Sequence, residues 1–212
     1  MSTEREPMDV LDAIATTRSM RRLKPDPIPD DVIRTILEAA VHAPSGSNQQ
    51  TWSFIVIRDA DIKKRIQELY HTAAYDYFAM RDARERPMSE EDRAQARRVR
   101  KSAAYLAEHV HEAPVLIMCC IRGRESFSLG SSIFPAVQNL ILAARAFGVG
   151  STLTSFQRAR DAQIRELLNL PDNTHAAALI PLGYPTGRWA EGKRKPLEDI
   201  VFADRYGDKL YS

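Results

Sequence analysis

Hydrophobic residues recur along the chain at two spacings, one typical of helices and the other of strands. A period of three to four residues predicts one helix that begins at Val10 and others over about 30–43, 61–112, 133–147 and 161–168. The helical stretch over 61–112 is expected to be interrupted near Pro87. Alternating or continuous runs of β-branched and aromatic residues predict strands over 52–57, 115–121, 151–154 and 176–182. From residue 184 onward prolines and glycines interrupt both patterns, which predicts an extended arm over 184–212. The pattern therefore predicts a single α/β domain over 1–212.

Polar residues, prolines and glycines mark the ends of several elements. Asp9 is expected to cap the first helix, because its carboxylate accepts from the unpaired N–H groups of a first turn. The prolines of 23–29 exclude a helix there, since each removes a donor and favours extended backbone. Gly148 is expected to end the helix over 133–147. That helix is apolar on most sides, so we expect it to be buried centrally or at a subunit interface.

Composition narrows the class of protein. The chain has 212 residues, of which 44% are hydrophobic and 27% charged, as in ordinary globular proteins. The net charge of +2 does not require a nucleic acid or an anionic membrane as partner. Eight basic and five acidic residues interleave over 81–101, which favours a solvated helix face over a nucleic-acid-binding stripe. No apolar run approaches 18 residues and the N-terminus is polar, so we expect a cytoplasmic protein with no membrane span.

Several catalytic signatures are missing from the sequence. There is no phosphate-binding Walker loop, zinc-protease motif or nucleophile elbow, and Gly148 and Gly150 lack the third glycine of a dinucleotide fingerprint. The five histidines are scattered, so no metal site is expected. Cys119 and Cys120 are predicted to be small apolar residues of a buried strand. We therefore expect chemistry that depends on neither a metal nor a side-chain nucleophile.

Three polar clusters remain as candidate sites. The loop over 43–52 offers uncharged donors and acceptors beside Trp52 and Phe54, which suits a polyol or the edge of a heteroaromatic ring, although the same residues are common in plain turns. The segment over 18–22 carries three arginines and a serine, which suit a phosphate or form a solvated basic turn. The tail segment over 193–196 is a short basic run that would bring a second source of positive charge to the same phosphate.

Taken in order, these clusters resemble the nitroreductase-like family of flavin enzymes. The matching motifs span nearly the whole chain: Arg18-Ser-x-Arg21, Ala43-Pro-Ser-Gly-x-Asn-x-Gln50 with Trp52 and Phe54, Pro135-Ala-Val-Gln-Asn-Leu140, Gly148-Val-Gly-Ser-Thr-Leu-Thr154, Leu182-Gly-Tyr-Pro185 and Arg194-Lys-Pro-Leu197. The resemblance implies an α+β nitroreductase-like fold with a central, mostly antiparallel sheet flanked by helices. It also implies an intertwined homodimer with two FMN sites at the subunit interface.

The resemblance also assigns roles to individual residues. It implies that a basic residue of 18–22 and Ser19 bind the FMN phosphate, and that Arg21 lies near the N1/O2 edge of the flavin. A cation there would stabilise the negative charge of the reduced ring. The partner subunit would supply residues of the polar loop. Residues 152–154 would line the flavin ring near its N5 and O4 atoms, and Arg194 of the tail would bind the phosphate. The implied cofactor-binding residues are Arg18, Ser19, Arg21, Ser45, Gly46, Asn48, Gln50, Thr152, Leu153, Thr154 and Arg194.

Two positions depart from the family pattern. Thr17 stands where many members have a further arginine, so Arg22 or Lys193 would have to supply that charge. Thr51 replaces the proline that usually precedes the tryptophan, which we expect to change the rigidity of the loop more than its chemistry.

The expected activity is a ping-pong oxidoreductase in which NAD(P)H reduces FMN and a nitroaromatic, quinone or similar planar acceptor then accepts the electrons. No catalytic side chain is expected, since the flavin itself reacts. The helical stretch over 70–100 is a candidate lid, in which Tyr70, Tyr75, Tyr77 and Phe78 either stack on the acceptor or belong to the core. The resemblance leaves three alternatives open: reductive dehalogenation, a biosynthetic oxidation with FMN or a deazaflavin, and flavin binding without turnover.

Overall fold

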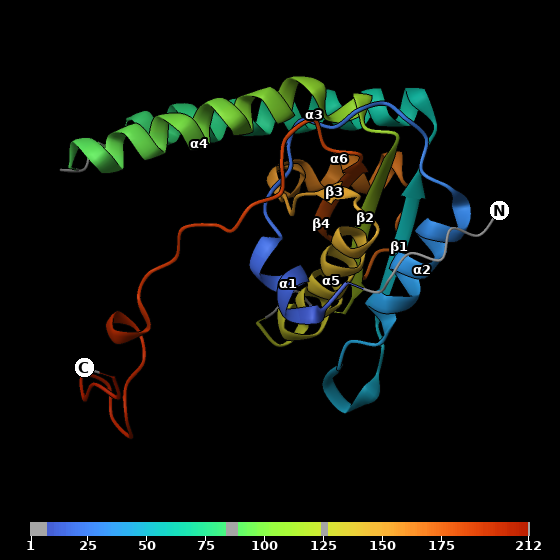
Figure 1. Ribbon diagram of the computed structural model, residues 1–212. Helices are drawn as coiled ribbons and strands as arrows, with labels where there is room; N and C mark the ends of the chain where they lie inside the picture. Colours follow the sequence, from blue (N-terminus) through green and yellow to red (C-terminus); the bar gives the residue numbers. More distant parts are fainter. Residues whose placement is uncertain (1–7, 84–88, 124–126, 212) are drawn as a thin grey trace.

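The computed structural model describes residues 8–83, 89–123 and 127–211. Helices surround a small central sheet, and α3 and α4 run side by side as a long pair (Figure 1). In chain order the helices and strands are α1 (Val10–Thr16), α2 (Asp30–Val41), β1 (Trp52–Ile57), α3 (Ala60–Asp82), α4 (Glu90–His109), β2 (Val115–Arg122), α5 (Phe127–Ala146), β3 (Gly150–Ser151), α6 (Asp161–Leu167) and β4 (Thr174–Gly183). Short 3₁₀ turns are η1 (Gly46–Asn48), η2 (Val110–Glu112), η3 (Phe156–Arg160) and η4 (Leu197–Asp199).

The sheet has four strands in the order β1-β2-β4-β3, and every described pairing is antiparallel. Trp52 at the start of β1 pairs with Ile121 near the end of β2. At the other end of the sheet, Val115 of β2 pairs with Leu182 of β4, which in turn pairs with Ser151 of β3. The α+β fold class and the mostly antiparallel sheet that the family resemblance implies are thus confirmed, whereas the pattern alone predicted an α/β domain. The register also shows that β1 and β3 form opposite edges of the sheet.

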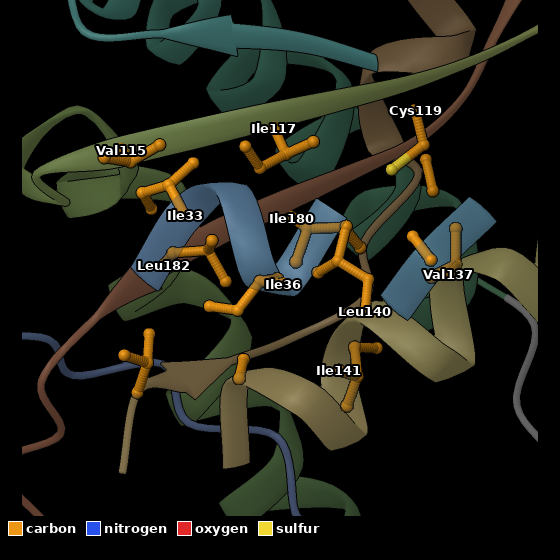
Figure 2. Packing of buried hydrophobic residues seen from close by; sticks show 14 of the residues in the cluster. Ile33, Ile36, Val115, Ile117, Cys119, Val137, Leu140, Ile141, Ile180 and Leu182 are labelled. Atoms are coloured by element: carbon orange, nitrogen blue, oxygen red, sulfur yellow. The ribbon is translucent and has the colours of Figure 1, made fainter. Parts of the chain in front are cut away.

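Alternate residues of β2 belong to two hydrophobic clusters, one on each face of the sheet. Val115, Ile117 and Cys119 pack against α2 and α5, and Figure 2 shows Ile36 and Leu140 of those helices converging with them. The opposite face of β2 packs against α3, α4 and α6 through Leu116, Met118 and Cys120. This arrangement follows from the two-residue period of a strand that is covered on both sides.

The adjacent cysteines of β2 are therefore core residues on opposite faces of the sheet. Both are free and have no exposed surface. Burial raises the pKa of Cys119 and raises that of Cys120 to about 11, so neither thiol ionises near neutral pH. The prediction that they serve as small apolar residues is confirmed.

Several predicted element ends are also found. The Asp9 carboxylate accepts from the N–H of Leu11 at 2.8 Å and so caps α1. At the C-terminal end of α5, Gly148 adopts a left-handed φ of 70°, and the N–H of Val149 donates to the carbonyl of Ala144. These contacts satisfy groups that a helix end leaves unpaired.

Other boundaries differ from the predictions. The helix predicted over 133–147 begins earlier, at Phe127, and Pro135 is accommodated inside it. The strand predicted over 151–154 is shortened to Gly150–Ser151, and Thr154 makes a separate bridge to Leu179 of β4. The predicted interruption at Pro87 lies outside the described residues, although α3 and α4 are helical on either side.

The chain after β4 has little regular structure. Within 184–211 the described elements are η4 and isolated bridges such as Phe202 with Lys209, and the segment runs away from the sheet (Figure 1). None of the helices in the described part of the chain combines the length and the apolar character needed to span a membrane.

Candidate active site

The segment that follows α1 lies across one edge of the sheet. The N–H of Met20 donates to the carbonyl of Ser151 at 2.9 Å, and the N–H of Lys24 donates to the carbonyl of Tyr184 at 2.8 Å. These two bonds attach the segment to β3 and to the end of β4. The basic cluster near the N-terminus is thereby brought next to residues 152–154, although more than a hundred residues separate them in sequence.

Two paired glycines make this close contact possible. Gly150 of β3 pairs with Gly183 of β4. A Cβ atom built on Gly183 would lie 2.9 Å from the Cβ of Leu23, and one built on Gly150 would lie 3.0 Å from the Cβ of Met20. Real Cβ contacts are rarely that short, so a larger residue at either position would push the segment outward.

Arg21 is the residue of this segment that points into a cavity. Its side chain is partly buried, and burial lowers the pKa of its guanidinium below the usual value, an effect partly offset by the nearby Tyr70 hydroxyl. No carboxylate of the described residues forms an ion pair with it. A half-buried cation without a counter-ion is unfavourable in the protein alone and favours an anionic ligand.

Tyr70 and Thr154 lie beside Arg21 at the floor of the cavity. Their hydroxyl oxygens are 2.5 Å apart, and the tyrosine side chain is only 1% exposed. Burial raises the pKa of Tyr70 to about 12, and the hydrogen bond to Thr154 and the charge of Arg21 partly offset that rise. Tyr70 therefore stays protonated at neutral pH and holds the Thr154 side chain in place.

The cavity has a volume of about 1580 Å³ and lies between α3, α4 and residues 153–156. Tyr77, Phe78 and Phe156 form an aromatic wall, in which the Tyr77 and Phe156 ring centroids are 5.3 Å apart and those of Phe78 and Phe156 are 5.8 Å apart. The volume exceeds that of typical small-ligand pockets, so it has room for more than one planar ring. Aromatic faces favour such rings as ligands.

Thr152 is a buried residue that directly precedes Leu153 at the cavity. The Thr152 side chain is only 2% exposed, and its hydroxyl oxygen has no hydrogen-bond partner among the described residues. An unpaired buried hydroxyl is costly, so this group is suited to a polar atom of a ligand. Leu153 is exposed and lines the cavity directly.

The polar loop after α2 forms a separate cluster. The Ser45 hydroxyl accepts from the N–H of Gln50 at 3.0 Å, and the Asn48 side-chain oxygen accepts from the Gln50 amide at 3.1 Å. Ser47, Asn48 and Gln50 all have left-handed φ angles near 50°. Such backbone costs energy in residues other than glycine and concentrates at functional sites.

Gly46 attaches this loop to α5. Its N–H donates to the hydroxyl of Ser132 at 3.2 Å. Ser132 is buried, and sequence reasoning did not single it out. Only the fold shows that a serine on α5 accepts a hydrogen bond from a loop 86 residues earlier in the chain.

Within one chain the polar loop and Arg21 are not brought together. The loop leads into Trp52 at one edge of the sheet, whereas Thr152 follows Ser151 at the opposite edge. Three strand spacings of about 4.8 Å separate these edges, and the two clusters also lie toward opposite strand ends. The two clusters therefore belong to different edges of the sheet.

The other candidate basic residues are exposed. The Arg22 guanidinium lies over the ring of Tyr105, 3.9 Å from its centroid, and Lys193 forms an ion pair with Glu91 at 3.2 Å. Arg194 donates to the neighbouring carbonyl of Lys193 at 3.1 Å. Arg18 and Ser19 are exposed on the segment after α1.

The four aromatic residues proposed for the lid divide between core and cavity. Tyr70 and Phe78 are buried, so they belong to the core while also reaching the cavity. Tyr77 is 39% exposed and lines the cavity, whereas the Tyr75 hydroxyl donates to Glu108 at 2.7 Å. Phe156, which the sequence analysis did not identify, contacts three of these rings. Its position shortly after Thr154 was the one signal in the sequence that could have marked it as a site residue.

The fold and the site together indicate the family of proteins to which the chain belongs. Residues 14–184 match the model of the nitroreductase family, so the chain belongs to that family. A relative from Thermus thermophilus, an NADH dehydrogenase, is 30% identical over 210 residues, which are 92% of this chain and 95% of the relative. An iodotyrosine deiodinase from Danio rerio is 28% identical over 194 residues, which are 87% of this chain and 63% of that protein.

Solved structures have the same fold. An oxidised iodotyrosine deiodinase bound to FMN and 3-iodo-L-tyrosine superimposes with a TM-score of 0.73 at 24% identity, covering 93% of this chain and 98% of that one. The resemblance to the nitroreductase family stated from the sequence motifs is thus confirmed.

Proposed function

We propose that the protein is a homodimeric oxidoreductase that binds FMN and uses NAD(P)H to reduce quinones, nitroaromatics or similar planar acceptors. For a quinone the overall reaction is NAD(P)H + H⁺ + quinone → NAD(P)⁺ + hydroquinone. The observation that carries the proposal is the half-buried Arg21 guanidinium, which has no carboxylate partner among the described residues and faces a cavity with aromatic walls. Family membership and the names of the relatives support the same conclusion.

The described residues fit FMN. Arg21 would meet the edge of the ring that becomes negative on reduction. The Thr152 hydroxyl, which has no hydrogen-bond partner among the described residues, would meet a polar ring atom. Thr154, held by Tyr70, and Leu153 would lie against the ring. Arg18, Ser19 and Arg194 are proposed for the phosphate. When bound, FMN supplies two-electron redox chemistry, while the protein orients the reactants and excludes water.

The position of the second cluster supports the proposal of a homodimer. Ser45, Gly46, Asn48 and Gln50 are proposed to complete the flavin site of the partner subunit, because they lie at the sheet edge opposite Arg21. Exposed apolar side chains supply surface for such an interface. They lie on α1 and along the C-terminal segment: Val10, Leu11, Ile14, Leu197, Ile200, Leu210 and Tyr211.

Purified protein tests the proposal directly. We expect a yellow protein with a flavin absorption spectrum, bleached by NADH or NADPH under argon and recoloured by a quinone. We expect the mass of a dimer in light scattering. A colourless protein that neither binds added FMN nor quenches its fluorescence would refute the flavin site, and bound flavin that no nicotinamide reduces would favour storage without turnover.

Reductive dehalogenation is a second candidate, supported by the similarity to iodotyrosine deiodinase. Its overall reaction is aryl halide + NAD(P)H → arene + halide + NAD(P)⁺. Release of iodide from an iodophenol, measured with an iodide electrode, would support this candidate. Reduction of quinones without any iodide release would exclude it.

A further inference from the structure

The rim of the cavity carries several arginines, and most of them already have a carboxylate partner. Arg100 forms an ion pair with Asp82, and Arg97 forms one with Glu90 at 2.8 Å. Arg93 lies 3.9 Å from the same Glu90 carboxylate. Arg81 forms no ion pair with any described residue. Of the rim arginines that the structure describes, Arg81 therefore has the charge that is most available to a ligand.

Arg81 lies next to the aromatic wall. It is one helical turn after Tyr77 on α3, and its guanidinium donates to the Tyr77 hydroxyl at 3.4 Å. The Tyr77 ring in turn contacts Phe156 with centroids 5.3 Å apart. Both Arg81 and this pair of rings line the cavity. A cation and an apolar, planar surface are therefore presented side by side.

The carboxylates near Arg81 interact with other groups. Asp82 is bound by Arg100, which also lies over the Phe78 ring. Asp92 accepts from the Ser89 hydroxyl at 2.6 Å in the first turn of α4, where the helix N-terminus stabilises its charge. Neither carboxylate forms an ion pair with Arg81. Among the described residues, no carboxylate forms an ion pair with Arg81 at the entrance.

We propose that the cavity selects electron acceptors in which a planar aromatic ring carries a carboxylate. Arg81 binds the carboxylate, because the two-pronged geometry of a guanidinium matches a carboxylate. The ring contacts Tyr77 and Phe156. This inference rests on the proposed function, since it names the class of acceptor for the same cavity.

A pair of acceptors that differ in charge tests the inference. The wild-type protein is assayed with 4-nitrobenzoate and 4-nitrobenzamide, which share a ring and a nitro group. Arg81→Gln should lower kcat/KM for 4-nitrobenzoate about tenfold, the effect expected for the loss of one charge-assisted hydrogen bond, and leave 4-nitrobenzamide unchanged. Arg98→Gln is the matched control, because Arg98 lies on the neighbouring helix α4, bonds to Gln95 and does not line the cavity.

Two results would overturn the inference while leaving the proposed function intact. One is an equal effect of Arg81→Gln on both acceptors, or no effect on either. The other is a rise in KM for NADPH but not for NADH, with the acceptors unaffected, which would assign Arg81 to the 2′-phosphate of the reductant.

If neither acceptor is reduced, a binding measurement tests the inference instead. The purified protein is then titrated calorimetrically with each of the two compounds. A preference for 4-nitrobenzoate that Arg81→Gln removes supports the inference, and equal or absent binding of the two compounds overturns it. Failure of the proposed function is recognised separately, by a protein that binds no FMN.

Discussion

The hydroxyl groups of Tyr70 and Thr154 lie 2.5 Å apart and join the middle of α3 to the loop that follows β3. Both residues are buried, and the ring of Tyr70 also packs edge-on against Phe156, with centroids 5.4 Å apart. This contact couples the packing of the α3–α4 pair to a residue proposed to lie against the flavin. The geometry of the site therefore depends on a core hydrogen bond.

Tyr70→Phe should destabilise the protein by about 1–2 kcal/mol, because the Thr154 hydroxyl loses its partner while remaining buried. Urea unfolding at neutral pH measures the change in the free energy of unfolding. Tyr206→Phe is the control, since Tyr206 is 94% exposed. If both substitutions had the same effect, the buried hydrogen bond would contribute nothing to stability.

Alkaline pH should reveal the buried tyrosine. The pKa of Tyr70 is about 12 in the folded protein, against an ordinary value of 10.0. Its contribution is fully present below pH 10 and is lost as the pH rises toward 12, because the unfolded chain ionises first. The wild type should therefore lose about 1 kcal/mol more than Tyr70→Phe between pH 9 and pH 11. Parallel pH profiles of the two proteins would contradict this.

Arg21→Gln should weaken FMN binding without lowering the stability of the flavin-free protein. The substitution removes a cation that burial makes unfavourable, so the flavin-free protein should be at least as stable as the wild type. FMN should dissociate about tenfold more readily, because a charge-assisted contact is lost. Fluorescence titration with FMN and thermal unfolding measure the two quantities. Arg34→Gln, which affects an exposed pair with Glu38, should change neither. An unchanged FMN affinity for Arg21→Gln would remove Arg21 from the site.

Gly183→Ala should displace the segment that carries Arg21. The added methyl group would lie 2.9 Å from the Cβ of Leu23, so we expect a loss of about 1–3 kcal/mol together with weaker FMN retention. Gly187→Ala is the control, because a Cβ there meets nothing within 4 Å. A Gly183→Ala protein as stable as this control would show that the segment adjusts without cost.

Most of the fold could be predicted from local pattern. The strand over 52–57 and the helix beginning at Val10 have the expected positions, since both depend on periodicity and capping within a few residues. The start of α5 could not be predicted in the same way, because Pro135 and Gly130 argue locally against a helix that the core stabilises. The short strand β3 likewise depends on distant partners, since Gly150 and Ser151 pair with Gly183 and Leu182 of β4.

The candidate site could be predicted in part. Arg21 and Thr154 were identified from motifs, and the structure brings both to one cavity. The roles of Gly183 and Phe156 could not be deduced, since each depends on a neighbour distant in sequence: Leu23 for the glycine, and the rings of α3 for the phenylalanine. The roles assigned to Arg18 and Arg194 stay predictions.

The placement of Arg21 and the polar loop at opposite sheet edges has a genetic consequence. In the proposed symmetric dimer, each flavin site takes Arg21 from one chain and Asn48 from the other. A chain defective at Arg21 and a chain defective at Asn48 would then form a mixed dimer in which both lesions fall in the same site. The other site of that dimer would be built entirely from intact halves, so two inactive alleles expressed together should restore activity that neither provides alone.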